Sequence, residues 1–229
     1  GSDAAGGFLE LFDAQASNNP VSLGEAAVSG APAAVAANGD FAFVTATESG
    51  VSTLFVFELV GPGAPVLVGS ATLPASANDL AVTPELALVA SDAGLDVLDI
   101  RDPALAELLG SYPTTEPSLG VAASGEFALM VAVDGLSMLN VSDPASPQLA
   151  GMAFTPGSAV AVEGKHALVT DGGVFWSVDI SDPASLNPGA RLPLAGDGLA
   201  IAVADNIACI AAGDTGALVV DTRYPASPD

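Results

Sequence analysis

The chain has 229 residues, of which 50% are hydrophobic and 14% are charged, a composition that excludes an intrinsically disordered protein. Its formal net charge is -23, because 27 acidic residues are opposed by only four Lys and Arg residues. Nucleic-acid binding relies on Lys and Arg displacing counterions, so this charge balance excludes nucleic acid as a partner and disfavours anionic lipid.

One pattern recurs six times along the chain: an apolar strand that ends in an acidic or amide residue, a turn usually built on Asp-Pro, and a second strand that contains Gly. In chain order the strand-ending residues are Asp13, Glu58, Asp99, Asn140, Asp179 and Asp221, spaced by 45, 41, 41, 39 and 42 residues. A period of this length indicates a radial or solenoid array of repeats. Because no linker interrupts the array, residues 1–229 are predicted to form a single domain.

Each repeat resolves into four short strands separated by turn residues. Residues 73–112, for example, contain the segments NDLAVTP, ELALVAS, GLDVLDI and AELLGSY, which predict a four-stranded antiparallel meander. The first two strands of this unit recur five times, with Gly, Asn, Asp or Pro in the turns between them, as tight hairpins require. No segment has sustained helical periodicity, and no apolar run is long enough for a membrane helix. The sequence therefore predicts an all-β fold with five inner hairpins.

The phrase G-apolar-x-apolar-x-Asp-Ile-Ser-Asp-Pro-x-x-Pro is clearest at Gly135 to Pro147 and Gly173 to Pro183. It resembles the LVIVD repeat of bacterial and archaeal β-propellers. The resemblance covers nearly the whole chain, but two copies depart from it, with Ala16-Ser17-Asn18 and Val60-Gly61-Pro62 in place of Ser-Asp-Pro. It implies a propeller of four-stranded antiparallel blades, in agreement with the meander above. It also implies a secreted, cell-surface or periplasmic protein, often a module of a larger chain, with no catalytic residues common to the family.

Five inner hairpins favour five blades. We expect repeats near 29–73, 74–112, 113–153 and 154–194, and a closing blade in which residues 195–229 join residues 6–28. The C-terminal unit stops at the turn Tyr224-Pro225, and the segment from Pro20 to Val28 resembles its missing outer strand. Joining the two would protect the exposed sheet edges. Residues 8–13 would then duplicate the third strand of that blade. Either this strand adds at the seam, or the chain is part of a larger six- or seven-bladed ring.

An acidic residue occupies the turn between the second and third strands of every unit. In a blade meander these turns lie at one face of the ring, so the five acids are predicted to surround one mouth of the channel. Carboxylates in such a ring could hold a divalent cation such as Ca²⁺, or a basic peptide. A simpler interpretation is that Asp before Gly favours a tight hairpin. The residues are Glu48, Asp92, Asp134, Asp171 and Asp214.

Other polar residues are expected to be structural. The Asp of the Asp-Pro turns and the strand-ending Asp and Asn residues can accept nearby backbone N–H groups. The single cysteine, Cys209, is expected to be a small buried core residue, and His166 is expected to be solvated at a hairpin tip. Trp176, Phe55 and Phe57 are expected to pack between blades.

The sequence contains no GxSxG, HExxH, GKS or CxxC motif, so we expect no enzymatic activity and no cofactor other than Ca²⁺ as a candidate. The predicted function is an extracellular or cell-surface propeller that binds a protein partner or belongs to a larger surface assembly. One alternative is a propeller hydrolase or lyase with an acidic site at the channel mouth. The other is an inert structural spacer.

Overall fold

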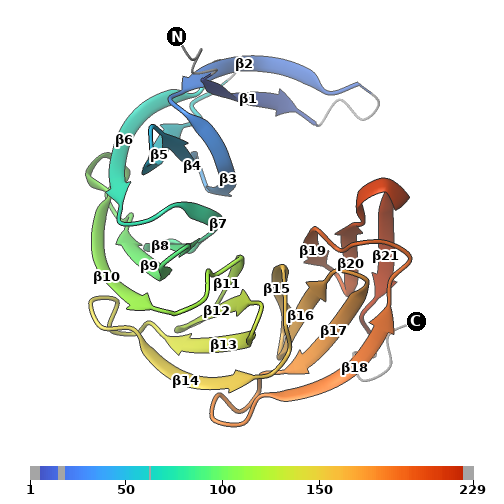
Figure 1. Cartoon of the computed structure of the whole chain (residues 1–229). Helices are drawn as coiled ribbons and strands as arrows, with labels where there is room; N and C mark the ends of the chain where they lie inside the picture. Colours follow the sequence, from blue (N-terminus) through green and yellow to red (C-terminus); the bar gives the residue numbers. More distant parts are fainter. Residues whose placement is uncertain (1–5, 15–18, 62, 224–229) are drawn as a thin grey trace.

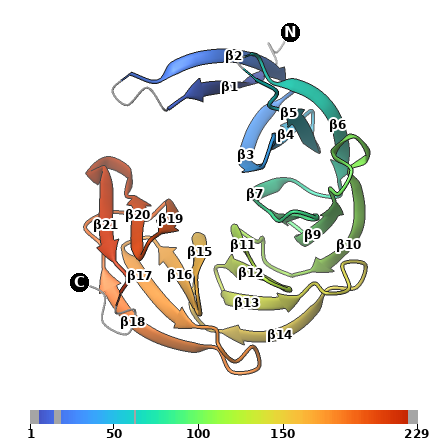
Figure 2. The same cartoon turned by 180° about the vertical axis from the view of Figure 1, so that it is seen from behind.

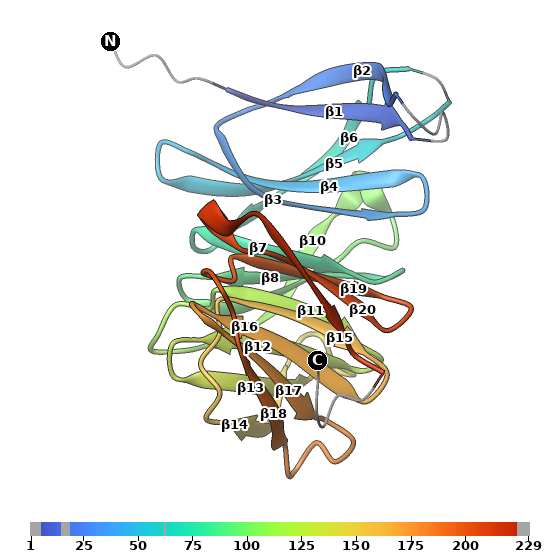
Figure 3. The same cartoon turned by 90° about the vertical axis from the view of Figure 1, so that its right-hand side faces the viewer.

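The computed structural model describes residues 6–14, 19–61 and 63–223. Within these ranges the chain forms 21 β-strands and two short 3-10 turns, and the strands make six antiparallel sheets. The sheets are arranged around a common axis (Figure 1), and in a side view their hairpin turns gather at the two faces of the ring (Figure 3). The predicted all-β propeller is confirmed. No helix in the described part of the chain is long and apolar enough to cross a membrane.

Four sheets are complete blades whose strands follow one another from the axis outward, so that each blade has an inner, a second, a third and an outer strand. Blade I contains β3 (Ala31–Asn38), β4 (Phe41–Glu48), β5 (Val51–Glu58) and β6 (Val66–Leu73). Blade II contains β7 (Ala77–Val82), β8 (Leu86–Ser91), β9 (Gly94–Asp99) and β10 (Glu107–Pro113). Blade III contains β11 (Gly120–Ser124), β12 (Phe127–Ala132), β13 (Gly135–Asn140) and β14 (Gln148–Ala153). Blade IV contains β15 (Ala159–Glu163), β16 (His166–Asp171), β17 (Val174–Asp179) and β18 (Asn187–Pro193).

The two ends of the chain form smaller sheets. Blade V has three strands, β19 (Ala200–Ala204), β20 (Ile207–Ala211) and β21 (Ala217–Asp221), and β1 (Gly7–Asp13) pairs with β2 (Val21–Val28) alone. All five predicted inner hairpins are present, one in each of blades I to V, so the five predicted blades are found within the described residues.

The expected closing blade does not form as one sheet, because β19–β21 and β1–β2 are separate sheets. Strand β2 pairs with β1 from Val28 opposite Gly7 to Val21 opposite Asp13, so β1 occupies the edge that β21 would need. An opening in the ring separates the two sheets (Figures 1 and 2). The turn expected at Tyr224-Pro225 lies outside the described residues.

Neighbouring blades are held together by apolar side chains that alternate along each strand and point to opposite faces of the sheet. Between blades IV and V, for example, Leu168 and Phe175 of one blade pack against Ala208, Ile210 and Val220 of the next. Burial of this kind stabilises the fold by roughly 25 cal/mol per Å² of apolar surface. We call the face that a blade presents to the next blade in the chain its forward face.

A glycine at the fourth position of the outer strand lets the next blade approach closely. A Cβ atom on Gly69 would lie 2.2 Å from the carbonyl oxygen of Pro103, and one on Gly110 would lie 2.6 Å from that of Pro144. The Asp-Pro turns of blades II and III therefore rest on the outer strand of the preceding blade. Gly24 of β2 meets the Cα of Ala64 in blade I in the same way, at 2.6 Å from its ideal Cβ, so β1–β2 corresponds to the outer half of a further blade.

Candidate functional site

The five predicted acidic residues lie at equivalent places, because each is either the last residue of the second strand of its blade or comes shortly after it. Since the second strands all run in the same direction, these turns share one face of the ring. All five side chains are exposed: Glu48, Asp92, Asp134, Asp171 and Asp214. Within residues 6–14, 19–61 and 63–223, no three His, Cys, Asp or Glu side chains are close enough to hold a metal ion together. The structure thus places the acids on one face without bringing them together as a ligand set.

The surroundings of these acids fit tight turns. Nδ2 of Asn78 donates to Oδ1 of Asp92 at 3.0 Å and to the carbonyl oxygen of Ser118 at 3.0 Å, which ties the Asp92 turn to the chain entering blade III. Gly94 follows at a φ of 126°, and Gly172 follows Asp171 at a φ of 49°, values that favour glycine. Asp92 and Asp171 are therefore explained locally by their hairpins, whereas Asp214 lies in the short 3-10 turn Gly213–Thr215.

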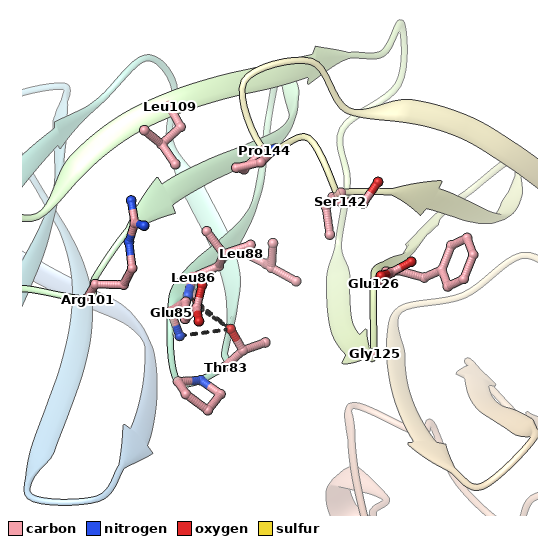
Figure 4. A pocket seen from close by; sticks show the side chains of 13 residues that line it. Thr83, Glu85, Leu86, Leu88, Arg101, Leu109, Gly125, Glu126, Ser142 and Pro144 are labelled. Atoms are coloured by element: carbon pink, nitrogen blue, oxygen red, sulfur yellow. Dashed lines mark hydrogen bonds between the residues drawn. The ribbon is translucent and has the colours of Figure 1, made fainter.

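A groove of about 550 Å³ lies between blades II and III on the opposite face of the ring, where the turns between inner and second strands are found. Figure 4 shows that its two walls come from different blades, with Thr83 and Glu85 on one side and Glu126 and Ser142 on the other. The apolar part of the lining consists of Pro84, Leu86, Leu88, Leu109, Phe127, Val141 and Pro144. An apolar lining with a few polar groups at the rim is typical of a binding site.

The charges at the rim of this groove are mostly negative. Nε of Arg101 donates to both carboxylate oxygens of Asp99, at 3.0 and 3.1 Å, and this hydrogen bonding lowers the pKa of Asp99 to about 2. Arg101 is therefore paired with Asp99, and its charge also acts on Glu85 at longer range. Glu85 and Glu126 are exposed, and neither takes part in an ion pair among the described residues. The rim thus offers two free carboxylates to a ligand.

The turn that carries Glu85 is closed by side-chain hydrogen bonds to its backbone. Oγ1 of Thr83 accepts the backbone N–H of Leu86 at 2.9 Å and that of Glu85 at 3.3 Å, as the dashed lines in Figure 4 show. These bonds hold Glu85 at the rim and direct Leu86 toward the apolar floor. A preorganised wall lowers the entropy that binding would otherwise cost.

A smaller groove of about 330 Å³ occupies the corresponding place between blades IV and V. Its lining includes Lys165, His166 and Arg223, and Glu163 crosses from blade IV to blade V by accepting the N–H of Asn206 at 2.7 Å and the hydroxyl of Thr222 at 2.8 Å. His166 is the first residue of β16 and is half-buried, and its Nδ1 has no partner within the described part of the chain. His166 flanks the hairpin tip, where its backbone lies opposite Glu163, but the expectation of a solvated histidine was wrong because the residue is half-buried and its Nδ1 is covered.

Most of the other predicted structural roles are confirmed. Oδ1 of Asp179 accepts the N–H of Ser181 at 2.8 Å, and Oδ1 of Asp182 in the Asp-Pro turn accepts that of Ala184 at 3.1 Å. Phe57 is fully buried, and Trp176 packs against the core between blades III and IV. Cys209, by contrast, is exposed, because no blade covers its side of β20 in the described structure.

Asp79 is a polar residue that the sequence analysis did not single out. Its carboxylate accepts the N–H of Leu80 at 2.8 Å and, across the blade boundary, the N–H of Val121 at 2.9 Å. Burial raises the pKa of this carboxyl, and the two backbone hydrogen bonds oppose the rise. The aligned positions in the other inner strands hold Ala or Gly, so the repeat pattern contains no signal for an acid here.

A ring of antiparallel blades around one axis defines this chain as a β-propeller. Residues 74–114, 118–155, 157–188 and 195–229 each match the LVIVD repeat. Because these four segments cover more than half of the chain, the protein belongs to the LVIVD repeat family. No curated protein matches the chain.

Two solved structures are similar in fold. One is a functionally unknown protein from Desulfotomaculum acetoxidans DSM 771, with a TM-score of 0.75 and 13% identity over 91% of this chain and 73% of that chain. The other is the computationally designed Ika8 protein, with a TM-score of 0.60 and 14% identity over 86% of this chain and 73% of that chain. At these identities the likeness shows the fold alone.

Proposed function

We propose that this propeller is a non-enzymatic binding module, and that the groove between blades II and III binds a short extended segment of a protein partner. The observation that carries the proposal is the combination of an apolar floor with two unpaired carboxylates, Glu85 and Glu126, at its rim. A matching segment alternates apolar side chains with Lys or Arg.

The two parts of the groove have different roles in binding. Burial of apolar side chains against Leu86, Leu109 and Phe127 supplies most of the affinity, since each buried methylene is worth about 0.8 kcal/mol. The carboxylates, together with the net charge of -23, select a basic segment and speed its association at low salt.

The proposal assigns no catalytic residue. Among the residues that line this groove, the hydroxyls of Thr83 and Ser142 have no histidine beside them, and the single His166 lines the other groove. The proposed location is extracellular, cell-surface or periplasmic, which rests on the family resemblance. A structural role within a larger surface assembly is compatible with the same groove.

The test is a selection of random dodecapeptides displayed on phage against the immobilised chain. We expect enrichment of peptides that alternate Lys or Arg with apolar residues. The strongest peptide is then titrated by calorimetry into the parent chain, a Leu109→Asp variant and a Glu85→Gln/Glu126→Gln double variant. Leu109→Asp should abolish the heat, and the double variant should weaken binding about tenfold at low salt, with less effect at high salt.

The matched control is Glu107→Gln, which removes an exposed carboxylate from β10 outside the groove lining. It should leave the affinity unchanged, and all variants should unfold at the parent temperature. Equal binding to the parent and to Leu109→Asp would contradict the assignment of the groove. If Asp134→Asn abolished binding instead, the binding site would have to lie on the face of the ring that carries the five acidic turn residues.

A further inference from the structure

The forward face of blade V is apolar and exposed. Val219 is 67% exposed and Ile207 is 40% exposed, and a shallow hollow of about 340 Å³ lies over this sheet beside Cys209. The exposed residues of this face carry no charge; they are Ala200, Ala202, Ala204, Ile207, Cys209, Ala211, Ala217 and Val219.

The equivalent face of each other blade is covered by the next blade in the chain. Cys209 is the third residue of its second strand, and the residues at the same place in blades I to IV are Phe43, Leu88, Leu129 and Leu168. None of these four is more than 1% exposed, because the next blade covers each of them. The face of blade V has the composition of a blade interface, yet no sheet of the described structure lies on it.

The sheet β1–β2, on the other side of the opening, is also incomplete. Leu9 and Ala26 pack against blade I, while Phe8 and Phe12 of β1 are 63% and 50% exposed. As Gly24 indicates, β1 and β2 are a third and an outer strand, and among the described residues no inner or second strand lies beside β1. Blade V, conversely, lacks only an outer strand among the described residues.

The sequence and the solved neighbour point to what fills this opening. Residues 221–229, DTRYPASPD, align with residues 140–148, NVSDPASPQ, which lead into the outer strand β14. The Desulfotomaculum acetoxidans structure superposes on 91% of this chain, and more than a quarter of that solved chain has no counterpart here.

We propose that the opening is filled by a sixth blade of the same repeat: polypeptide adjoining residues 1–229 adds an outer strand to β21 and an inner hairpin to β1–β2. These three strands would satisfy both unpaired edges and cover the face around Cys209 at once. A second copy of the chain related by a twofold axis would pair that face with itself and leave the edge of β1 unpaired. The inference is independent of the groove between blades II and III.

The test extends the chain by its own repeat. Because Asp229 and Gln148 occupy the same repeat position, a second copy of residues 149–171 is appended after Asp229, which supplies the outer strand and the hairpin equivalent to β15 and β16. The expected results are a higher unfolding temperature and a reaction of Cys209 with a thiol reagent that is at least tenfold slower, since the added sheet covers the cysteine.

The matched control carries Ala167→Asp and Val169→Asp in the appended copy only. Those two residues pack against blade III in the natural ring, so charges there should restore the parent reaction rate at Cys209. A Cys209 that reacts equally fast in the parent and in the extended chain would overturn the proposal.

A second measurement needs no extension. In the parent chain, Cys209→Asp/Val219→Asp should leave the unfolding temperature unchanged, because the face is open. A fall of several degrees, or a parent that sediments as a dimer with a protected Cys209, would show that another copy already covers the face and would overturn the proposal.

Discussion

Gly151 of blade III lies directly beneath the carbonyl oxygen of Pro183 in blade IV, so closely that a Cβ on Gly151 would be 1.9 Å from that oxygen. This contact joins the two residue types that mark the repeat, the outer-strand glycine and the proline of the Asp-Pro turn. It explains why both recur in register: the outer strands of blades I, II and III each need the glycine to receive the Asp-Pro turn of the next blade.

The first prediction concerns this contact. Gly151→Ala should lower the free energy of unfolding by about 2 kcal/mol, because the methyl group collides with backbone that cannot rotate away. Urea denaturation followed by circular dichroism measures the change. Gly63→Ala is the control, since a Cβ there meets nothing within 4 Å, and it should have little effect. Equal losses in both variants would contradict the argument.

The second prediction concerns Glu163, which holds blade V to blade IV. Glu163→Ala removes the acceptor for the Asn206 N–H and the Thr222 hydroxyl, and it should cost about 1–2 kcal/mol. Hydrogen exchange should accelerate at Asn206 and along blade V more than in blade II. Glu107→Ala, on an exposed strand position, should leave the exchange rates of both blades as they are.

The third prediction follows from the raised pKa of Asp79. The folded state holds this proton more tightly than the unfolded state, so the contribution of Asp79 to stability is largest at low pH. It declines as the pH rises from the unfolded pKa, near 3.8, through the raised folded pKa. Asp79→Asn cannot titrate. Its free energy of unfolding should therefore improve relative to the parent between about pH 4 and about pH 7.

Urea titrations of the parent and of Asp79→Asn at the two pH values measure this difference. Asp134→Asn serves as a control for removing a carboxylate from an exposed turn. A difference in unfolding free energy that shifts in favour of the parent as the pH rises would have the wrong sign for a carboxyl with a raised pKa.

The fourth prediction concerns Ca²⁺. Because the five acids of the turns lie singly and exposed, calorimetric titration with Ca²⁺ should give no saturable heat at a dissociation constant tighter than about 1 mM. A saturable signal that disappears in Asp134→Asn would restore the interpretation of these acids as a metal site.

Much of the fold could be predicted because the residues that define the repeat interact with neighbours close in the sequence. Asp179 bonds to the N–H two residues later, and Asp182 does the same in the next turn, so these residues define a strand end and a turn wherever they occur. Alternating apolar residues then define the two buried faces of each blade. The position of the five acids on one face followed from the same strand directions.

The candidate site could not be predicted, because it belongs to no single repeat. The groove brings Glu85 of blade II opposite Glu126 of blade III, and its floor combines Leu109 with Val141. Residues that are far apart in sequence become neighbours only when two blades meet, and the width of the space between them depends on how the sheets pack.

The sequence by itself determined the strands, the turns and the order of the blades, since each of these depends on hydrogen bonds and side-chain alternation within a few residues. Only the tertiary structure decided that Asp79 is partly buried, that Cys209 is exposed and that, among the described residues, the ring is open between β21 and β1. Burial depends on which sheet lies against a residue. Because all blades share one sequence pattern, that pattern does not indicate whether another sheet packs against the last blade.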